Sequence, residues 1–262
     1  MNIIVPVKSA IDVDLNIRVR DGKIVEDGMN WVLNRWDENA LEAALQLKEA
    51  SGEGEVTVVT VGPERSGEAL RKALAMGADR GVHVNDPATE GSDSFGYAKI
   101  LAKVAGRALF DLIITGKQAQ DTDMGGTGPI LAELLGLPQV VNVLHFDPPA
   151  GGKLNLHRLG AYGREVVELT LPALISASDS LNEPRLASLR GIMSAKKKPM
   201  DRLTLADLGL AADEVGVAGA RIEVTEFMPP PGRAAGQKFE GDAEEITRQV
   251  MALLANEAKI FS

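Results

Sequence analysis

The chain has 262 residues, of which 45% are hydrophobic and 25% are charged, and its formal net charge at pH 7 is −9. This composition is typical of a globular protein with a substantial core, and the acidic balance argues against binding to nucleic acid, which selects a basic surface. Because the chain has no cysteine and no run of roughly 18 apolar residues, we exclude disulfide bonds and thiolate or iron–sulfur chemistry, and we expect a cytoplasmic protein without membrane insertion whose redox role would need an organic cofactor.

Short β-branched runs alternate with segments of helical periodicity along the first 180 residues. The runs predict strands at 3–7, 56–61, 81–84, 112–115 and 140–143. Between them the spacing predicts helices at 38–49, 67–76, 94–108 and 128–135. Continuous apolar strands separated by helices indicate a parallel sheet covered on both faces, so we predict a doubly wound α/β fold.

Local signals add caps and hairpins to this pattern. Asn34 or Asp37 is the candidate N-cap of the first helix, Ser66 is that of the second, and Gly77 ends the second helix. Turn residues predict hairpins at 17–25 and 153–169, both at the edges of the sheet.

Regular alternation ends near residue 180, and we divide the chain accordingly. We expect an α/β domain over 1–180, an irregular basic surface segment over 181–203, and an extended C-terminal arm over 204–262. The arm has little apolar periodicity, so we expect it to wrap over a partner chain.

The loops after the strands are the candidate ligand site, because ligands of open α/β sheets bind beyond the carboxyl ends of the strands. Pro6 and Val61 end two strands, and the glycine-rich loop 116–129 leads into a helix, where free N–H groups and the helix dipole favour a phosphate. A glycine-rich helix start without a ligand remains an equal alternative. We interpret Asp121 and Asp123 as polar or ribose contacts rather than metal ligands, and no catalytic nucleophile, Walker or Gly-x-Gly-x-x-Gly pattern is present.

Basic and apolar residues alternate between 185 and 198, where no acidic residue occurs. A solvated charged loop is one interpretation. Apolar residues ringed by basic ones also suit docking to an acidic protein, and we favour this second interpretation.

Several short motifs occur in a characteristic order along the whole chain. They are Val5-Pro6-Val7-Lys8, the helix of residues 34–49, Ala73-Leu74-Ala75-Met76-Gly77-Ala78-Asp79-Arg80, Gly116-Lys117-Gln118-Ala119, Leu181-Asn182-Glu183-Pro184-Arg185, Ser188-Leu189-Arg190-Gly191-Ile192-Met193 and Ala195-Lys196-Lys197-Lys198. Together they resemble the beta subunit of an electron-transfer flavoprotein, and the stretch from Asn182 to Lys198 is the most specific.

The resemblance implies a fold of the adenine-nucleotide α-hydrolase-like kind, paired with an alpha subunit that holds most of the redox FAD. It implies that this chain helps to hold that FAD and binds AMP in its own crevice. The implied cofactor-binding residues are Pro6, Asn34, Arg35, Trp36, Asp37, Val61, Gly116, Gln118, Asp121, Thr122, Asp123, Met124, Gly125, Gly126 and Thr127.

The resemblance also implies a recognition loop whose central leucine, Leu189, inserts into a flavin dehydrogenase such as an acyl-CoA dehydrogenase. The implied partner-binding residues are Arg185, Leu189, Ile192, Met193, Lys196, Lys197 and Lys198. In this interpretation the chain is an electron-carrier subunit rather than an enzyme, and the electrons pass on to a quinone oxidoreductase or another acceptor.

Two alternatives remain. Residues 121–129 resemble the Asp-Gly-Asp-Thr-Ala-Gln-Val-Gly-Pro pattern of electron-bifurcating members, in which a second FAD replaces AMP; Thr122, Met124, Gly125 and Gly126 depart from that pattern, so AMP is our expectation. From another class, a stand-alone nucleotide-binding enzyme or stress protein could use the same fold.

Overall fold

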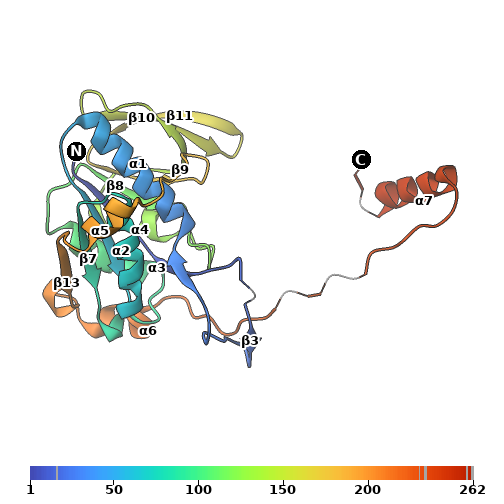
Figure 1. Cartoon of the computed structure of the whole chain (residues 1–262), viewed down its shortest axis with the longest axis horizontal. Helices are drawn as coiled ribbons and strands as arrows, with labels where there is room; N and C mark the ends of the chain where they lie inside the picture. Colours follow the sequence, from blue (N-terminus) through green and yellow to red (C-terminus); the bar gives the residue numbers. More distant parts are fainter. Residues whose placement is uncertain (16, 230, 233–234, 258, 261–262) are drawn as a thin grey trace. The chain divides into compact units, whose positions relative to one another are not determined.

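The computed structural model describes the chain except for residues 16, 230, 233–234, 258 and 261–262 (Figure 1). The chain forms two compact units, Met1–Phe227 and Met228–Ser262. The first unit contains the sheet and its helices. In the second unit the described residues include the helix α7 (Ala243–Asn256).

A nine-stranded sheet with the order β11-β10-β9-β12-β8-β1-β6-β7-β13 is the centre of the first unit. Neighbouring strands in the part β9-β12-β8-β1-β6-β7-β13 are parallel. At the other edge, β10 and β11 form a hairpin, and β10 pairs antiparallel with β9. The strands are β1 (Ile3–Pro6), β6 (Val56–Val61), β7 (Arg80–Val84), β8 (Leu112–Gly116), β9 (Gln139–Phe146), β10 (Lys153–Gly160), β11 (Gly163–Thr170), β12 (Ala173–Ala177) and β13 (Met200–Leu203).

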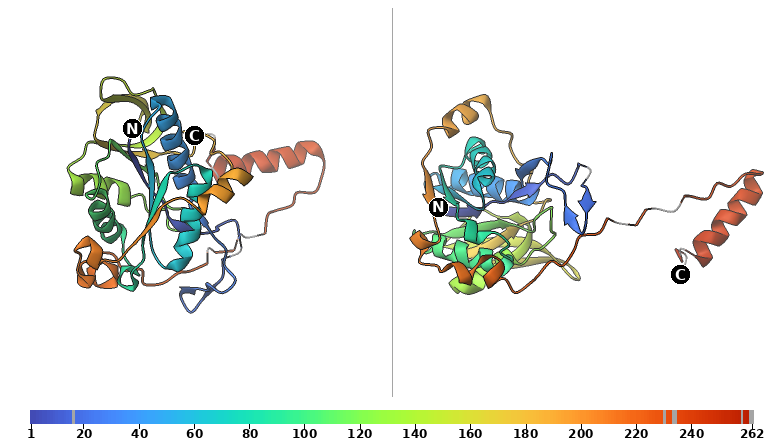
Figure 2. Two further views of the ribbon diagram at one scale, coloured as in Figure 1. Left: turned by 60° about the vertical axis from the view of Figure 1, so that its left-hand side comes forward. Right: turned by 90° about the horizontal axis from the view of Figure 1, so that it is seen from below.

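Helices cover both faces of the sheet (Figure 2). One face packs against α1 (Arg35–Ser51), α2 (Gly67–Met76) and α5 (Leu189–Ala195). The other face packs against α3 (Ser94–Ala105) and α4 (Thr127–Leu135). The predicted α/β fold is therefore confirmed, with an antiparallel hairpin added to the parallel sheet.

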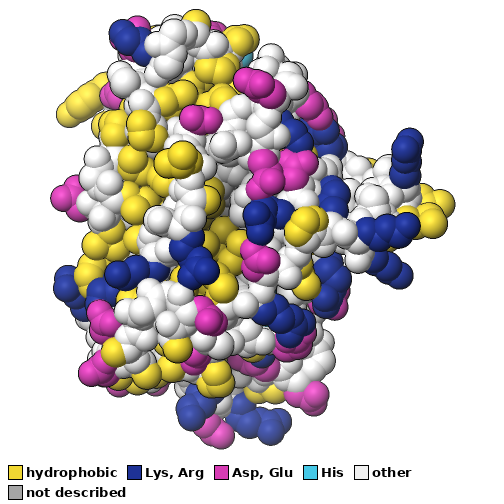
Figure 3. All heavy atoms as spheres, turned by 90° about the vertical axis from the view of Figure 1, so that its left-hand side faces the viewer, with side chains coloured by type: hydrophobic (Ala, Val, Ile, Leu, Met, Phe, Trp, Pro, Cys, Tyr) yellow, Lys and Arg dark blue, Asp and Glu magenta, His cyan; other side chains and the backbone are white. Residues whose placement is uncertain are grey.

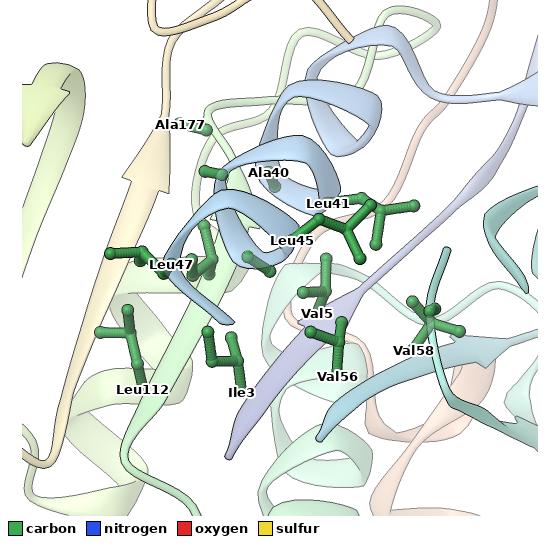
Figure 4. Packing of buried hydrophobic residues seen from close by; sticks show 14 of the residues in the cluster. Ile3, Val5, Ala40, Leu41, Leu45, Leu47, Val56, Val58, Leu112 and Ala177 are labelled. Carbon is green, nitrogen blue, oxygen red and sulfur yellow. The ribbon is translucent and has the colours of Figure 1, made fainter. Parts of the chain in front are cut away.

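Alternation along each strand divides the core into two layers. In β1, the side chains of Ile3 and Val5 belong to the cluster under α1, whereas Ile4 belongs to the cluster under α3. Figure 4 shows Leu41 and Leu45 of α1 over the first of these layers. All five of these side chains are buried, so both faces of the strand stabilise the fold by removing apolar surface from water.

Smaller elements complete the first unit. Two short antiparallel pairs follow β1, and several single helical turns lie between and after the main elements. They are β2 (Ser9–Ile11) with β5 (Trp31–Leu33), β3 (Val19–Arg20) with β4 (Lys23–Ile24), η1 (Glu64–Ser66), η2 (Pro87–Thr89), η3 (Ala206–Leu208), η4 (Ala212–Glu214) and α6 (Gly216–Gly219).

Three sequence predictions differ from the structure. The hairpin of 17–25 forms, but as a separate two-stranded sheet rather than at an edge of the main sheet. The basic segment is not wholly irregular, because it contains α5. The first part of the expected C-terminal arm packs on the domain: Leu205, Leu208, Leu210 and Val215 are buried in the cluster under α3.

Acidic and basic side chains lie next to one another on the face of the molecule in Figure 3, around areas of exposed hydrophobic side chains. None of the helices in the described part of the chain combines the length and apolar character that crossing a bilayer requires.

Candidate functional site

A cavity of about 410 Å³ opens at the carboxyl ends of β1, β6 and β8. This is the edge at which open α/β sheets bind ligands. The amino-terminal ends of α3 and α4 also border the cavity. The side chain of Asp93 caps α3, whereas α4 has no side-chain cap.

Most of the predicted cofactor-binding residues line this cavity. They are Pro6, Asn34, Asp37, Val61, Gly116, Gln118, Asp121, Thr122, Met124, Gly125 and Thr127. Four others lie outside the lining. Arg35 forms an ion pair with Asp14 (2.8 Å), Trp36 and Asp123 lie beside lining residues, and Gly126 immediately precedes α4.

Asp37 holds two strand ends together from the first turn of α1. Its carboxylate accepts hydrogen bonds from the backbone N–H groups of Lys8 (2.8 Å) and Gly116 (3.2 Å). Burial raises the pKa of Asp37 to about 7, although both hydrogen bonds and the charge of Lys8 act in the opposite direction. Asp37 is thus a buried connector rather than the helix cap that the sequence suggested.

Asn34 connects the start of α1 to the glycine-rich loop. Its Nδ2 donates to the carbonyl oxygen of Gln118 (2.9 Å), and its Oδ1 accepts from the N–H of Gln120 (3.0 Å). Asn34 occupies the N-cap position of α1, but its side chain makes no capping hydrogen bond. Because both polar atoms bind loop backbone, Asn34 fixes the course of the loop over the cavity.

Gly116 allows β8 and α1 to approach closely. A Cβ atom at this position would lie 2.3 Å from Oδ1 of Asp37 and 2.8 Å from the carbonyl carbon of Trp36. The second contact is with backbone, which cannot move aside by a rotamer change. The strand end therefore requires glycine here.

The start of α4 has the features of an anion site. Its N-cap, Gly126, provides no side-chain cap, which leaves the first N–H groups of the helix available. Thr115 is buried, and its Oγ1 has no hydrogen-bond partner among the described residues. A Cβ atom at Gly128 would lie 2.7 Å from this hydroxyl oxygen. Glycine thus allows the first turn of α4 to pack directly against Thr115.

The two aspartates of the loop have different partners. Oδ1 of Asp121 lies 2.6 Å from Nζ of Lys8, which connects the loops after β8 and β1. Oδ1 of Asp123 accepts a hydrogen bond from Nε2 of Gln118 (2.8 Å). Both carboxylates therefore have partners within the chain.

Sequence reasoning missed part of the cavity wall. Trp31 comes from β5, with the guanidinium of Arg65 at 4.1 Å from its ring centre, and Tyr97 comes from α3. Burial raises the pKa of the Tyr97 hydroxyl. The loop after β7, which contains Ser92 and Asp93, also lines the cavity. It could have been predicted, because ligands of open α/β sheets bind beyond the carboxyl ends of the strands.

The predicted partner-binding residues lie on or next to α5. Leu189, Ile192 and Met193 are exposed on this helix, and Lys196 and Lys197 are exposed after it. Arg185 and Lys198, in contrast, are only partly exposed, and both bind groups of this chain.

The sheet order and the position of the cavity define the chain as an open-sheet α/β protein with a candidate ligand site at the carboxyl ends of its strands. Residues 21–208 match the electron transfer flavoprotein domain. The chain belongs to the electron transfer flavoprotein family.

Relatives over the full length are named electron transfer flavoprotein subunit beta. The chain is similar to the protein of that name from Mycobacterium tuberculosis, with 41% identity over 97% of this chain and 98% of the relative. The Bacillus subtilis protein is 38% identical over the whole of both chains. The Bradyrhizobium diazoefficiens protein is 40% identical, again over the whole of both.

Proposed function

We propose that this chain is the beta subunit of a heterodimeric electron-transfer flavoprotein. It accepts electrons from flavin dehydrogenases, such as acyl-CoA dehydrogenases, and passes them to a downstream acceptor such as a quinone oxidoreductase. Bound FAD, shared with the alpha subunit, would supply the redox chemistry, and this chain would supply orientation and docking. The observation that carries the proposal is the similarity to beta subunits over the whole chain, extended by the strand-end cavity.

The cavity residues fit an adenine nucleotide, and we assign AMP to this site. The N–H groups at the start of α4, which packs on Thr115, would hold the phosphate. The volume of about 410 Å³ is at the low end of the range of about 300–1,000 Å³ for small-molecule sites, which favours one mononucleotide over a second FAD. The second FAD of an electron-bifurcating relative is the alternative occupant.

Helix α7 supports pairing with an alpha subunit. Ile246, Val250, Leu253 and Leu254 have the spacing of one helix face, and the described residues of the second unit bury none of the residues of α7. Covering this apolar face with another protein would remove it from water and stabilise the helix. We propose that the alpha subunit covers it.

Co-expression with an alpha subunit tests the function. We expect a yellow heterodimer whose flavin is reduced by an acyl-CoA dehydrogenase and its substrate. A colourless chain that is active alone on nucleotides would instead support the stand-alone enzyme or stress protein.

A further inference from the structure

We propose that Arg185 and Lys198 are positioning residues that hold α5 as a preformed docking element, and that the charges presented to a partner are those of Arg190, Lys196 and Lys197. This inference rests on the docking role within the proposed function. It revises the assignment of Arg185 and Lys198 to partner binding and adds Arg190 to the charges that a partner meets. The argument begins at the two ends of the segment.

Arg185 is bound to α1 through two carboxylates. Its Nε and Nη2 donate to Glu42 at 2.8 and 3.0 Å, and its Nη1 and Nη2 donate to Glu49 at 2.6 and 3.1 Å. The side chain of Glu42 is only 5% exposed, so this pair is sheltered from the solvent screening that weakens ordinary surface ion pairs. Burial raises the pKa of Glu42, but the hydrogen bonds from Arg185 outweigh burial and keep that pKa below its usual value.

We call the contacts of Arg185 with Glu42 and Glu49 the clamp. A second contact, just before Arg185 in the chain, reinforces it. The Nδ2 of Asn39 donates to the carbonyl oxygen of Asn182 (2.8 Å), and the Nδ2 of Asn182 donates to the carbonyl oxygen of Asn39 (3.0 Å). This reciprocal pair ties the chain that leads into α5 to the first turns of α1.

Lys198 fixes the other end of the segment. Its Nζ donates to the carbonyl oxygens of Leu74 (2.8 Å) and Ala78 (2.6 Å) at the end of α2. A cation at the end of a helix satisfies free carbonyl groups and complements the helix dipole. The ammonium group therefore serves this chain, and burial lowers its pKa.

Gly191 brings α5 into direct contact with α2. A Cβ atom at Gly191 would lie 2.3 Å from the carbonyl oxygen of Ala75. Figure 1 shows α5 beside α2, and Ala195 at the end of α5 is buried in the core cluster. One side of the helix is thereby fixed against the domain.

The opposite side of α5 is free to meet a partner. Leu189, Ile192 and Met193 have i, i+3 and i+4 spacing and are 76%, 48% and 66% exposed. Arg190, Lys196 and Lys197 are exposed and have no ion-pair partner within the described residues. Apolar side chains flanked by free positive charges fit an acidic protein surface with an apolar pocket.

The anchors matter because α5 has only seven residues. Isolated helices of this length are unstable in water. Contacts with α1 and α2 must therefore maintain the helix, and they would remove the entropic cost of ordering it when a partner binds.

Hydrogen exchange of the heterodimer tests the positioning directly. In Arg185→Ala we expect the amides of α5 to exchange about tenfold faster or more, because the local opening of the segment becomes easier. The matched control is Arg190→Ala, which also removes one positive charge from the segment but no anchor; its α5 amides should exchange at the wild-type rate. Unchanged α5 exchange in Arg185→Ala would overturn the proposal.

Amides of β1 and β6 report whether the domain itself is intact. If the amides of β1 and β6 also exchange faster in Arg185→Ala, the test uses Lys198→Met instead. This variant removes the second anchor and leaves the contacts of Arg185 in place. Faster exchange confined to α5 in this variant supports positioning, and wild-type exchange contradicts it.

Electron transfer from an acyl-CoA dehydrogenase separates positioning from docking. Arg185→Ala should raise the KM for the heterodimer and keep the salt dependence of kcat/KM, whereas neutralising Lys196 and Lys197 should weaken that salt dependence. If no variant changes these kinetics while α5 exchange still rises in Arg185→Ala, the anchors are retained and the docking role is rejected.

Discussion

The buried carboxyl of Asp37 should make the stability of the chain depend on pH. Raising its pKa from 3.8 to about 7 corresponds to a preference of about 4 kcal/mol for the protonated form in the folded chain. Because the folded pKa exceeds the unfolded one, this contribution is complete below pH 3.8 and is lost as the pH rises through about 7. Folding at neutral pH must therefore accommodate a buried charge.

Asp37→Asn removes the charge and keeps the size of the side chain. At pH 4 the variant should be less stable than the wild type by about 1–3 kcal/mol, because the amide nitrogen cannot accept one of the two hydrogen bonds from Lys8 and Gly116. Between pH 4 and pH 8 the variant should gain up to about 4 kcal/mol relative to the wild type. The difference in the free energy of unfolding between the two proteins should therefore shrink to zero or change sign by pH 8.

Urea unfolding at several pH values measures the free energy of unfolding of the wild type and of Asp37→Asn under the same conditions. Glu42→Gln, on the same helix, is the matched control with the opposite sign: the pKa of Glu42 is lowered, so its stabilisation is present above about pH 4.5 and is lost as the pH falls. A difference between the wild type and Asp37→Asn that stays constant from pH 4 to pH 8 would refute the reasoning.

Three further changes have defined outcomes. Gly116→Ala should lower the free energy of unfolding by about 1–3 kcal/mol, since its Cβ would lie 2.8 Å from backbone; Gly106→Ala, which meets only an ordinary contact, should stay within about 0.5 kcal/mol of the wild type in the same denaturation assay. Leu189→Ala should weaken binding of an acyl-CoA dehydrogenase by about 2 kcal/mol, or roughly 30-fold in Kd, without changing the flavin content; a wild-type Kd would exclude Leu189 as an anchor. Truncation after Phe227 should abolish the heterodimer in size-exclusion chromatography while circular dichroism shows a folded domain, and an intact complex would contradict the role of α7.

Local patterns predicted those parts of the fold that depend on local physics. β6 has the predicted bounds, because Val56–Val61 is a continuous β-branched run. The central strand β12 was not predicted: Ala173–Ala177 is only five residues long and contains alanine and serine, and its place between β8 and β9 depends on partners distant in sequence. The Asp21-Gly22 turn predicted a hairpin, but turn chemistry does not determine which sheet a hairpin joins.

The candidate site shows the same limit. The glycine-rich loop and the strand ends were predicted because they follow apolar runs and precede a helix. Asn34 and Asp37 were predicted as caps, whereas their side chains bind backbone groups about 80 residues away along the chain. Arg185 looked like a free surface charge for the same reason, since its partners lie on α1. Spacing along the chain carries no information about such distant contacts.

The nucleotide content of the purified heterodimer tests the central claim most directly. Denaturation releases the bound nucleotides, and chromatography then counts FAD and AMP for each heterodimer. We predict one FAD and one AMP, with the AMP lost when Gly128 is replaced by a bulky residue, because its side chain would collide with Thr115 and displace the start of α4. Two FAD molecules would identify the bifurcating alternative, and a heterodimer with no adenine nucleotide beyond the shared FAD would contradict the assignment of the cavity.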